Sequence, residues 1–339
     1  MKKIALTISV VILALMNCQN QNERKFSEGK KLSEYKETDF LPTLEHPINA
    51  QKNSIYCVTL LHAWEEIRNL INRPLIISEE YNDLLLLNNS KSFINVLKSD
   101  EYTAIGTIDG DLISAKAEFN KSLPFEIKLN SYNNKLKFKG KPVSSFGVNY
   151  YDSYEQLKNV RIIYYQNDDN FIIKLLPKDK KHEIILFKTD KIFHSIAEMN
   201  EEILTLSKIG KDECKNGKLQ WKYWFSTNED EVVIPKFNFN IETNYANLEG
   251  KTFKTTAQDY KIATAWQRTA FLLDESGAEI ESEAVAEAAC VEEEEEKYEK
   301  PHPKKMIFDK DFLILLKRTD SQNPYFGLWV ANTELMIPE

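Results

Sequence analysis

Residues 271–296 constrain this chain most, because an apolar strand pattern passes over one glycine into alternating small and acidic residues. In an extended chain successive side chains point to opposite faces, which would separate the small residues from the glutamates. The small or apolar set is Ala278, Ile280, Ser282, Ala284, Ala286 and Ala288, and the acidic set is Glu279, Glu281, Glu283 and Glu287. The pattern predicts an exposed loop that carries a latent strand. A solvated helix or a disordered linker is the alternative, since alanine and glutamate favour helices over strands.

Three blocks of sequence surround this loop in a fixed order. Upstream of it, Glu275-Ser-Gly277-Ala-Glu279 ends the strand pattern of residues 262–274, and downstream Phe308-Asp-Lys-Asp-Phe312 leads into an apolar run. Earlier in the chain, Val232-Val-Ile-Pro-Lys-Phe237 precedes Tyr245-Ala-Asn-Leu248. These blocks resemble the hinge, the Phe-Asn-x-Pro-Phe signature and the Leu-Pro-Lys-Phe strand of the serpin family. The resemblance is strongest over residues 230–332.

Two further blocks extend the resemblance more weakly. Leu136-Lys-Phe138-Lys-Gly140, with Phe146, is similar to the Tyr-Phe-Lys-Gly strand of the family, and residues 52–59 are similar to the Asn-x-x-Tyr/Phe-Ser-Pro segment before its second helix. The resemblance implies an α+β, serpin-like fold, with large, mostly antiparallel β-sheets, helices packed around them and an exposed reactive loop at about residues 275–307. A single domain over residues 41–339 fits 10 glycines, 11 prolines and no internal repeat.

The resemblance also implies a function. Serpins are suicide inhibitors of serine or cysteine proteases. The protease cleaves the reactive loop of the serpin, and the serpin then inserts that loop into one of its own sheets. Carried over position by position, the hinge is Glu275, Gly277, Ala278 and Glu279, and the scissile region is Cys290, Val291 and Glu292. Such a loop implies a monomeric inhibitor of elastase-like, papain-like or glutamate-specific proteases. It requires no catalytic residue, cofactor or metal of its own.

The hinge departs from the family pattern after Glu279. Serpins have a run of alanines here, whereas this chain has Ile280, Glu281, Ser282 and Glu283. On the alternating pattern the acids lie on the outward face, so insertion need not bury a carboxylate, and Ile280 is the larger steric change. The alternatives are a non-inhibitory, serpin-like binding or substrate protein on the cell envelope, and an unrelated surface-binding lipoprotein.

Composition excludes several classes of function. The net charge of -8 argues against nucleic acid or an anionic membrane as the partner. The chain has no Gly-x-Ser-x-Gly elbow, phosphate-binding loop, His-Glu-x-x-His or paired Cys-x-x-Cys, so it is not expected to be an enzyme. The histidines lack metal-ligand spacing, and His62 fits a core or surface residue of a helix better than a ligand. They are His46, His62, His182, His194 and His302.

The amino terminus predicts export. Lys2 and Lys3 precede a run of thirteen mostly apolar residues at 4–16, which suits a signal peptide over residues 1–18. Cys18 follows Ala14-Leu-Met-Asn17, which resembles a bacterial lipoprotein box, and residues 19–40 form a polar tether. We therefore expect lipid on Cys18 and an outer-membrane or cell-surface location, with ordinary secretion as the alternative.

Cysteine use follows from that expectation. If Cys18 carries lipid, Cys57, Cys214 and Cys290 remain, so at least one thiol is free or pairs between chains. Cys57 lies in an apolar segment and is predicted to be a buried small hydrophobe. Cys290 lies among glutamates that would raise its pKa, so it is predicted to be a plain loop residue and not a reactive thiol.

Periodicity predicts helices near the amino end and strands afterwards. The predicted helices are residues 55–71, 92–97 and 192–206. The predicted strands are residues 161–165, 171–176, 183–187, 219–225, 232–241, 262–274, 312–317 and 324–330.

Overall fold

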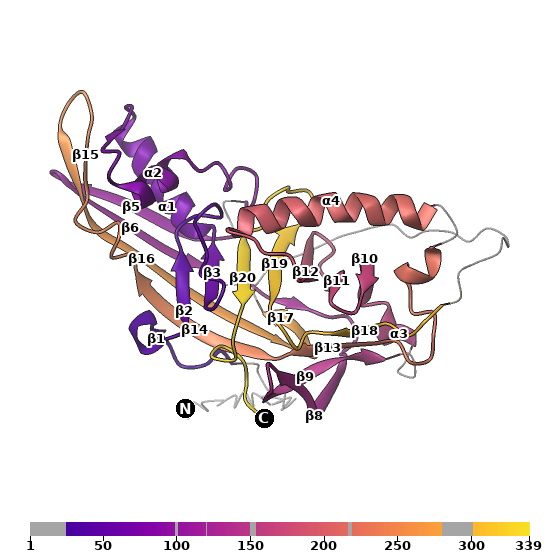
Figure 1. Ribbon diagram of the computed structural model, residues 1–339. Helices are drawn as coiled ribbons and strands as arrows, with labels where there is room; N and C mark the ends of the chain where they lie inside the picture. Colours follow the sequence, from indigo (N-terminus) through magenta and orange to yellow (C-terminus); the bar gives the residue numbers. More distant parts are fainter. Residues whose placement is uncertain (1–24, 99–100, 120, 150–153, 216–218, 280–300) are drawn as a thin grey trace, which may run out of the picture.

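The computed structural model describes residues 25–98, 101–119, 121–149, 154–215, 219–279 and 301–339. Most of them form three β-sheets, with helices on the outside (Figure 1). The helices are α1 (Thr59–Ile71), α2 (Asn82–Asn89), α3 (Tyr154–Leu157) and α4 (Ile196–Lys215), with 3-10 turns η1 (Leu32–Glu34) and η2 (Gln220–Tyr223). The predicted α+β class, with large and mostly antiparallel sheets, is confirmed.

The large sheet contains nine strands of the described residues and carries the hinge. Its strands are β1 (Lys30–Lys31), β4 (Ile76–Ile77), β5 (Thr103–Asp109), β6 (Leu112–Phe119), β7 (Leu123–Pro124), β14 (Phe237–Asn244), β15 (Thr252–Lys254), β16 (Asp259–Asp274) and β17 (Gly277–Glu279). β16 is the longest, and it pairs with β14 in antiparallel and with β6 in parallel orientation. A long strand with two long neighbours is therefore the centre of this sheet.

A second sheet of seven strands packs behind the first and supplies a large share of the core. Its strands are β2 (Thr38–Leu41), β3 (Asn53–Cys57), β10 (Val160–Asn167), β11 (Asn170–Leu175), β12 (His182–Lys188), β19 (Phe312–Arg318) and β20 (Phe326–Val330). β12, β19 and β20 are buried at every position, which explains their unbroken apolar runs. Phe271 of the large sheet stacks on Phe326 with ring centroids 4.8 Å apart. The two sheets thus share one hydrophobic core.

Helix α4 covers the other face of the seven-stranded sheet (Figure 1). It buries Ile196, Met199 and Ile203, which recur at helical spacing on one side. Helix α1 packs under β5 and β6 through residues such as Trp64 and Ile67.

A third sheet is formed by β8 (Asn130–Phe138), β9 (Lys141–Asn149), β13 (Glu231–Pro235) and β18 (Lys305–Ile307).

Most predicted elements lie where periodicity indicated them, and three predictions are wrong. Residues 92–97 form turns and not a helix, because Asn95 adopts φ +58° and the Ser92 backbone bonds the Ser90 hydroxyl. Residues 219–225 contain η2 and no strand, and Trp221 in this turn packs on His302 with ring centroids 4.4 Å apart. The helix predicted from residue 55 begins at Thr59, because residues 53–57 pair with β20 as β3. Strands β5 and β6 were not predicted.

The segment assigned to a tether is part of the fold from Lys25 onwards. β1 adds to the edge strand β14, and the Ser27 backbone N–H donates to Asn238 Oδ1 at 2.8 Å. Thr38 begins β2, which pairs in parallel with β3. The folded part of the described residues therefore begins before residue 41, since this backbone satisfies the hydrogen bonds of an otherwise open sheet edge.

Candidate functional site: the two ends of the reactive loop

The predicted hinge is a short buried strand. β16 ends at Asp274, the chain turns over Glu275 and Ser276, and β17 returns antiparallel to β16. The Asp274 carboxylate stabilises the turn by accepting a 2.7 Å bond from the Ser276 backbone N–H. Ala278 pairs with Leu273 and has no exposed surface, whereas Glu279 is half-buried. The small-inward, acid-outward alternation that the sequence predicts is thus present where β17 begins.

A segment on the opposite side of β17 holds it in the sheet. We name residues 121–129 the clasp. Leu123 and Pro124 of the clasp pair with Ala278 and Gly277 as strand β7. The backbone N–H groups of Phe125 and Leu129 donate to Ser276 O and Glu275 O, each at 2.8 Å. β17 is therefore a strand with a neighbour on both sides.

Glycine is required at position 277 for two reasons. Its φ of +121° is a backbone conformation that other residues rarely adopt. A Cβ there would also lie 2.3 Å from Leu123 O and 2.7 Å from Phe125 N. Gly277 therefore permits both the turn and the close contact with the clasp.

β6 and β16 separate at the point where β17 inserts. Their parallel pairing runs up to Phe119 and Thr269. Three residues further along β16, Leu272 pairs with Glu279 of β17, and the clasp has taken the place of β6 on the far side. We name this point the fork. A longer β17 would extend from the fork between β6 and β16.

An ion pair joins the hinge to the Pro-Lys-Phe block, which contains Lys236. Lys236 Nζ lies 2.6 Å from Glu275 Oε2, and the side chains are 14% and 26% exposed. Burial raises the pKa of Glu275, but the bond from Lys236 outweighs it and the pKa is lowered overall. The carboxylate therefore stays ionised at neutral pH.

The carboxyl end of the predicted loop is fixed more firmly. Lys304 Nζ lies 2.8 Å from Asp230 Oδ2, and neither side chain is exposed. The same ammonium group donates to Trp221 O at 3.1 Å and to Ser226 Oγ at 2.9 Å. Directly after Lys304, β18 pairs in parallel with β13. Burial raises the pKa of Asp230, but its bond to Lys304 lowers it overall.

The predicted loop of residues 275–307 is thus ordered into the sheets at both described ends, where the sequence predicted exposed chain. The amino end forms β17 because its small residues fit between β16 and the clasp. At the carboxyl end Lys304 is buried because Asp230 neutralises it. Cys290, Val291 and Glu292 of the scissile region, and the lipid-attachment residue Cys18, lie outside the described residues.

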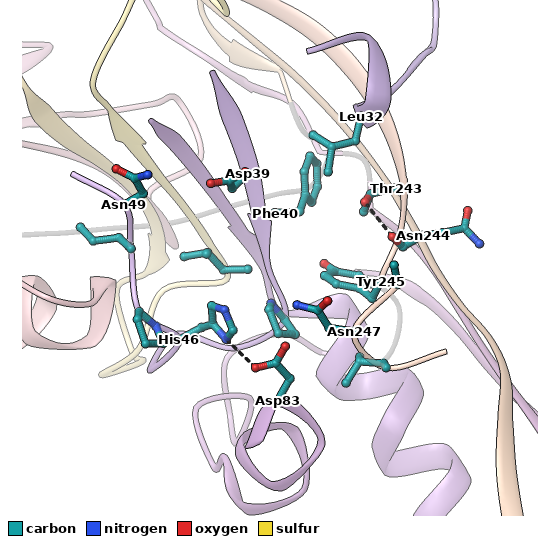
Figure 2. A pocket seen from close by; sticks show the side chains of 16 residues that line it. Leu32, Asp39, Phe40, His46, Asn49, Asp83, Thr243, Asn244, Tyr245 and Asn247 are labelled. Atoms are coloured by element: carbon teal, nitrogen blue, oxygen red, sulfur yellow. Dashed lines mark hydrogen bonds and ion pairs between the residues drawn. The ribbon is translucent and has the colours of Figure 1, made fainter. Parts of the chain in front are cut away.

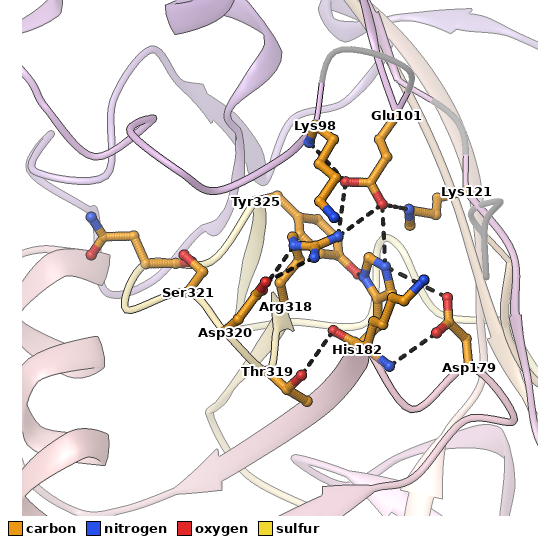
Figure 3. A network of polar contacts seen from close by, with 12 residues as sticks. Lys98, Glu101, Lys121, Asp179, His182, Arg318, Thr319, Asp320, Ser321 and Tyr325 are labelled. Carbon is orange, nitrogen blue, oxygen red and sulfur yellow. Dashed lines mark hydrogen bonds and ion pairs between the residues drawn. The ribbon is translucent and has the colours of Figure 1, made fainter. Parts of the chain in front are cut away.

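A buried polar network adjoins the clasp, and no sequence motif indicated it (Figure 3). Glu101 lies 2.6 Å from Lys121 Nζ, 3.2 Å from Arg318 and 3.3 Å from His182 Nε2. His182 Nδ1 contacts the Tyr325 hydroxyl at 3.0 Å. Burial raises the pKa of Glu101, and bonds to His182 and Lys121 outweigh that effect and lower it. These residues are far apart in the chain, so spacing could not reveal them.

The predicted roles of Cys57 and His62 are confirmed. Cys57 is fully buried, and burial raises the pKa of its thiol to about 11, so it is unreactive. His62 is buried and stacks on Tyr102 with ring centroids 4.0 Å apart. Burial lowers the pKa of His62 to about 4. In the part of the chain that the structure describes, no three His, Cys, Asp or Glu residues are placed to hold a metal ion.

A cavity of about 520 Å³ lies away from the hinge, where β2 and the chain after β14 meet (Figure 2). Phe40, Tyr245 and Leu248 provide apolar surface. His46 Nδ1 lies 3.9 Å from Asp83 Oδ1 on another side. Its size falls in the range of small-molecule sites.

Among the described residues, no helix has both the length and the apolar character needed to cross a membrane.

Comparison with known proteins finds similarity among solved structures alone. No family model matches this sequence, and no curated protein matches it. The similar solved structures are serpins. Serpin48 of the insect Tenebrio molitor is 15% identical, over 75% of this chain and 66% of that one, with a TM-score of 0.32. Serpin48 belongs to the family that the motifs resemble.

Two other structures give similar values. A serpin from the trematode Schistosoma haematobium is 10% identical, over 66% of this chain and 58% of that one, with a TM-score of 0.35. Thyroxine-binding globulin in complex with thyroxine is 12% identical, over 75% and 64% of the two chains, with a TM-score of 0.33. The match thus spans less than two thirds of the length of these three structures.

Proposed function

We propose that this protein is a serpin-like inhibitor of serine or cysteine proteases that acts by loop cleavage and strand insertion. The observation that carries the proposal is the position of β17. The hinge residues Gly277 and Ala278 already lie between β16 and the clasp, with Ala278 inward. The fork is therefore a starting point from which the loop can extend as a new central strand.

The chemistry belongs to the protease. Its serine or cysteine attacks a carbonyl carbon of the loop near residues 290–292, the amide C–N bond breaks, and an ester or thioester joins the two proteins. The new amino terminus takes a proton from the acid of the protease and leaves. Loop insertion then carries the bound protease along the sheet before water can hydrolyse the bond.

Strand alternation determines which side chains insertion would bury. Continuing from Ala278, residues 280, 282, 284, 286 and 288 would face the core, and residues 279, 281, 283 and 287 would face outward. The inward set is small apart from Ile280, and the acidic residues all fall in the outward set, together with Val285 and Ala289. Insertion therefore avoids burying an unpaired carboxylate, which would cost several kcal/mol. It also adds ladder hydrogen bonds of about 1 kcal/mol each.

A matched pair of loop variants tests this function. Ala284→Arg places a charge on the inward face and should abolish insertion, whereas Glu283→Arg places it on the outward face and should preserve it. Each protein is incubated with elastase-like, papain-like and glutamate-specific proteases, then read on a denaturing gel with intact-mass analysis. We expect a covalent complex for the wild type and Glu283→Arg, and cleavage without a complex for Ala284→Arg. Clean cleavage of the wild type with a fully active protease would refute the proposal.

The cavity favours a second candidate function, that of a non-inhibitory binding protein. Its apolar wall and its His46–Asp83 pair could hold a small molecule that has a ring and a hydrogen-bonding group. A ligand that stabilises the protein, together with loop cleavage that leaves the protease active, would select this function over inhibition.

The proposed location is the cell envelope, with lipid on Cys18 as the anchor. The composition of the leader supports it. Mass analysis of the mature protein from cells that express the wild type or Cys18→Ser tests it. A diacylglyceryl or acyl mass present only in the wild type is expected, and a mature protein without added mass would indicate ordinary secretion.

A further inference from the structure

Lys121 is the first residue of the clasp and is fully buried. Its Nζ lies 2.6 Å from Glu101 Oε1, closer than Arg318 at 3.2 Å or His182 at 3.3 Å (Figure 3). Leu123, two residues further on, pairs with Ala278 of the hinge. The position of β7, and hence the space available to β17, therefore depends on an ammonium group that Glu101 neutralises.

The same carboxylate binds the second sheet. Arg318 Nη1 contacts both Glu101 oxygens, at 3.2 and 3.3 Å, and His182 Nε2 lies 3.3 Å from Oε1. His182 opens β12 and Arg318 closes β19, and the two residues are paired in register. The Lys98 backbone N–H donates to Oε2 at 2.9 Å. Glu101 thus joins the clasp to the end of the β12–β19 pair.

Further contacts fix the surroundings of this junction. Asp179 Oδ2 lies 3.6 Å from His182 Nε2, and Asp320 holds the Arg318 guanidinium through bonds of 2.9 and 3.0 Å. The Lys178 backbone N–H donates to Pro124 O at 2.8 Å, which brings the chain before β12 onto the clasp. Thr103, two residues after Glu101, pairs with Glu118 at the fork end of β6. The network therefore lies where β6 would have to leave β16.

We propose that Glu101 is a positioning residue of the fork. It ties the end of β6 and the clasp to the seven-stranded sheet, and so sets how fast β6 separates from β16 when a strand enters between them. This inference rests on the proposed function, since it concerns the same insertion. Glu101 acts through Lys121, whose Nζ lies 2.6 Å from its carboxylate.

Two variants break the tie in different ways. Glu101→Gln removes the charge that Lys121 and Arg318 share, and Lys121→Met keeps the length of the buried chain while leaving Arg318 and His182 on Glu101. The control is Glu183→Gln, which breaks the Lys174–Glu183 pair of 2.5 Å in the same sheet as His182. The control separates loosening at the fork from general loss of stability.

The first readout is amide hydrogen exchange of the full-length protein over residues 112–119 and, as a reference, residues 231–235 of β13. Exchange at the first set should quicken at least about tenfold in both Glu101→Gln and Lys121→Met. It should not change in Glu183→Gln, and the reference should not change in any variant. Equal exchange in the wild type and the two variants would overturn the proposal, as would an equal gain in the control.

The second readout is uptake of a synthetic peptide of residues 278–290, followed on a native gel. Uptake should be faster in Glu101→Gln and Lys121→Met than in the wild type, and unaltered rates would overturn the role of Glu101. If no protein takes up the peptide, insertion as the proposed function fails. The exchange comparison then decides separately whether Glu101 holds the end of β6.

Discussion

The two described ends of the predicted loop, residues 275–279 and 301–307, are held by different interactions. At the amino end, β17 is held by backbone hydrogen bonds to β16 and the clasp, with a partly exposed Lys236–Glu275 pair. At the carboxyl end, Lys304 is anchored by an ion pair with Asp230 in which neither side chain is exposed. A hydrogen-bonded strand can exchange one set of partners for another, whereas a buried ammonium cannot leave its carboxylate without a large penalty.

This difference indicates which end is suited to move. A loop that inserts after cleavage needs an amino end that can lengthen β17, and a carboxyl end that stays with β18 and β13. The network at Glu101 adds a second contrast, because it ties the clasp to the seven-stranded sheet. Four predictions test this contrast, beginning with the largest effect.

Asp230→Asn should have the largest effect. It leaves the Lys304 ammonium buried without a counter-charge, so the free energy of unfolding should fall by about 3–5 kcal/mol. Urea denaturation measures this. The control is Asp259→Asn, which breaks the exposed Lys254–Asp259 pair of 3.3 Å and should change stability by less than about 0.5 kcal/mol. Equal losses in the two variants would remove the contrast between the loop ends.

Gly277→Val should release the amino end. The valine side chain would meet Leu123 O. Its backbone would also have to keep φ at +121°, at a strain of about 1–3 kcal/mol. We expect β17 to leave the sheet, which limited proteolysis near residue 279 would detect. Gly140→Val is the matched control, since Gly140 has φ +84° but no atom within 4 Å of a new Cβ. Unchanged cleavage near residue 279 in Gly277→Val would count against the close contact with the clasp.

Acid should destabilise the clasp and the carboxyl end of the loop at different pH. Burial lowers the pKa of His182 from its usual 6.5, so the folded state resists protonation and loses stability as pH falls below 6.5. The groups facing the ring are Glu101, Asp179, Lys121 and Tyr325. The pKa of Asp230 is lowered from 3.8, so its contribution is present above pH 3.8 and is lost only below it.

Hydrogen exchange between pH 7 and 5, corrected for its intrinsic pH dependence, measures this difference. Residues 112–124 should lose protection while residues 305–307 keep it, and His182→Gln should flatten the response of the first set. Equal loss of protection in residues 112–124 and 305–307 would show that His182 does not cause the difference between the two segments.

Glu275→Gln should have the smallest effect. The Lys236–Glu275 pair is partly exposed, so its loss should lower the free energy of unfolding by about 0.5–1 kcal/mol. Urea denaturation in low and high salt provides the measurement, since a screened pair should contribute less in high salt. A loss as large as that of Asp230→Asn would mean that both ends are anchored by charge.

The sequence predicted part of the candidate site for a local reason. The hinge is visible because a strand pattern, one glycine and alternating small residues follow one another within a few positions. The Pro-Lys-Phe block is equally local, but its contact with the hinge is not, since Lys236 reaches Glu275 across 39 positions. The contacts of Glu101 span up to 217 positions, so no spacing rule could group its partners.

Neighbouring residues were enough to predict the strands with unbroken or alternating apolar residues, among them β12, β16 and β19, because strand period is a local property of the sequence. Only the tertiary structure decided that the hinge is seated between β16 and the clasp, and that Lys121 and Lys304 are buried cations. The reason is desolvation. Whether a charge can be buried depends on a partner brought from elsewhere in the chain, and folding alone supplies that partner.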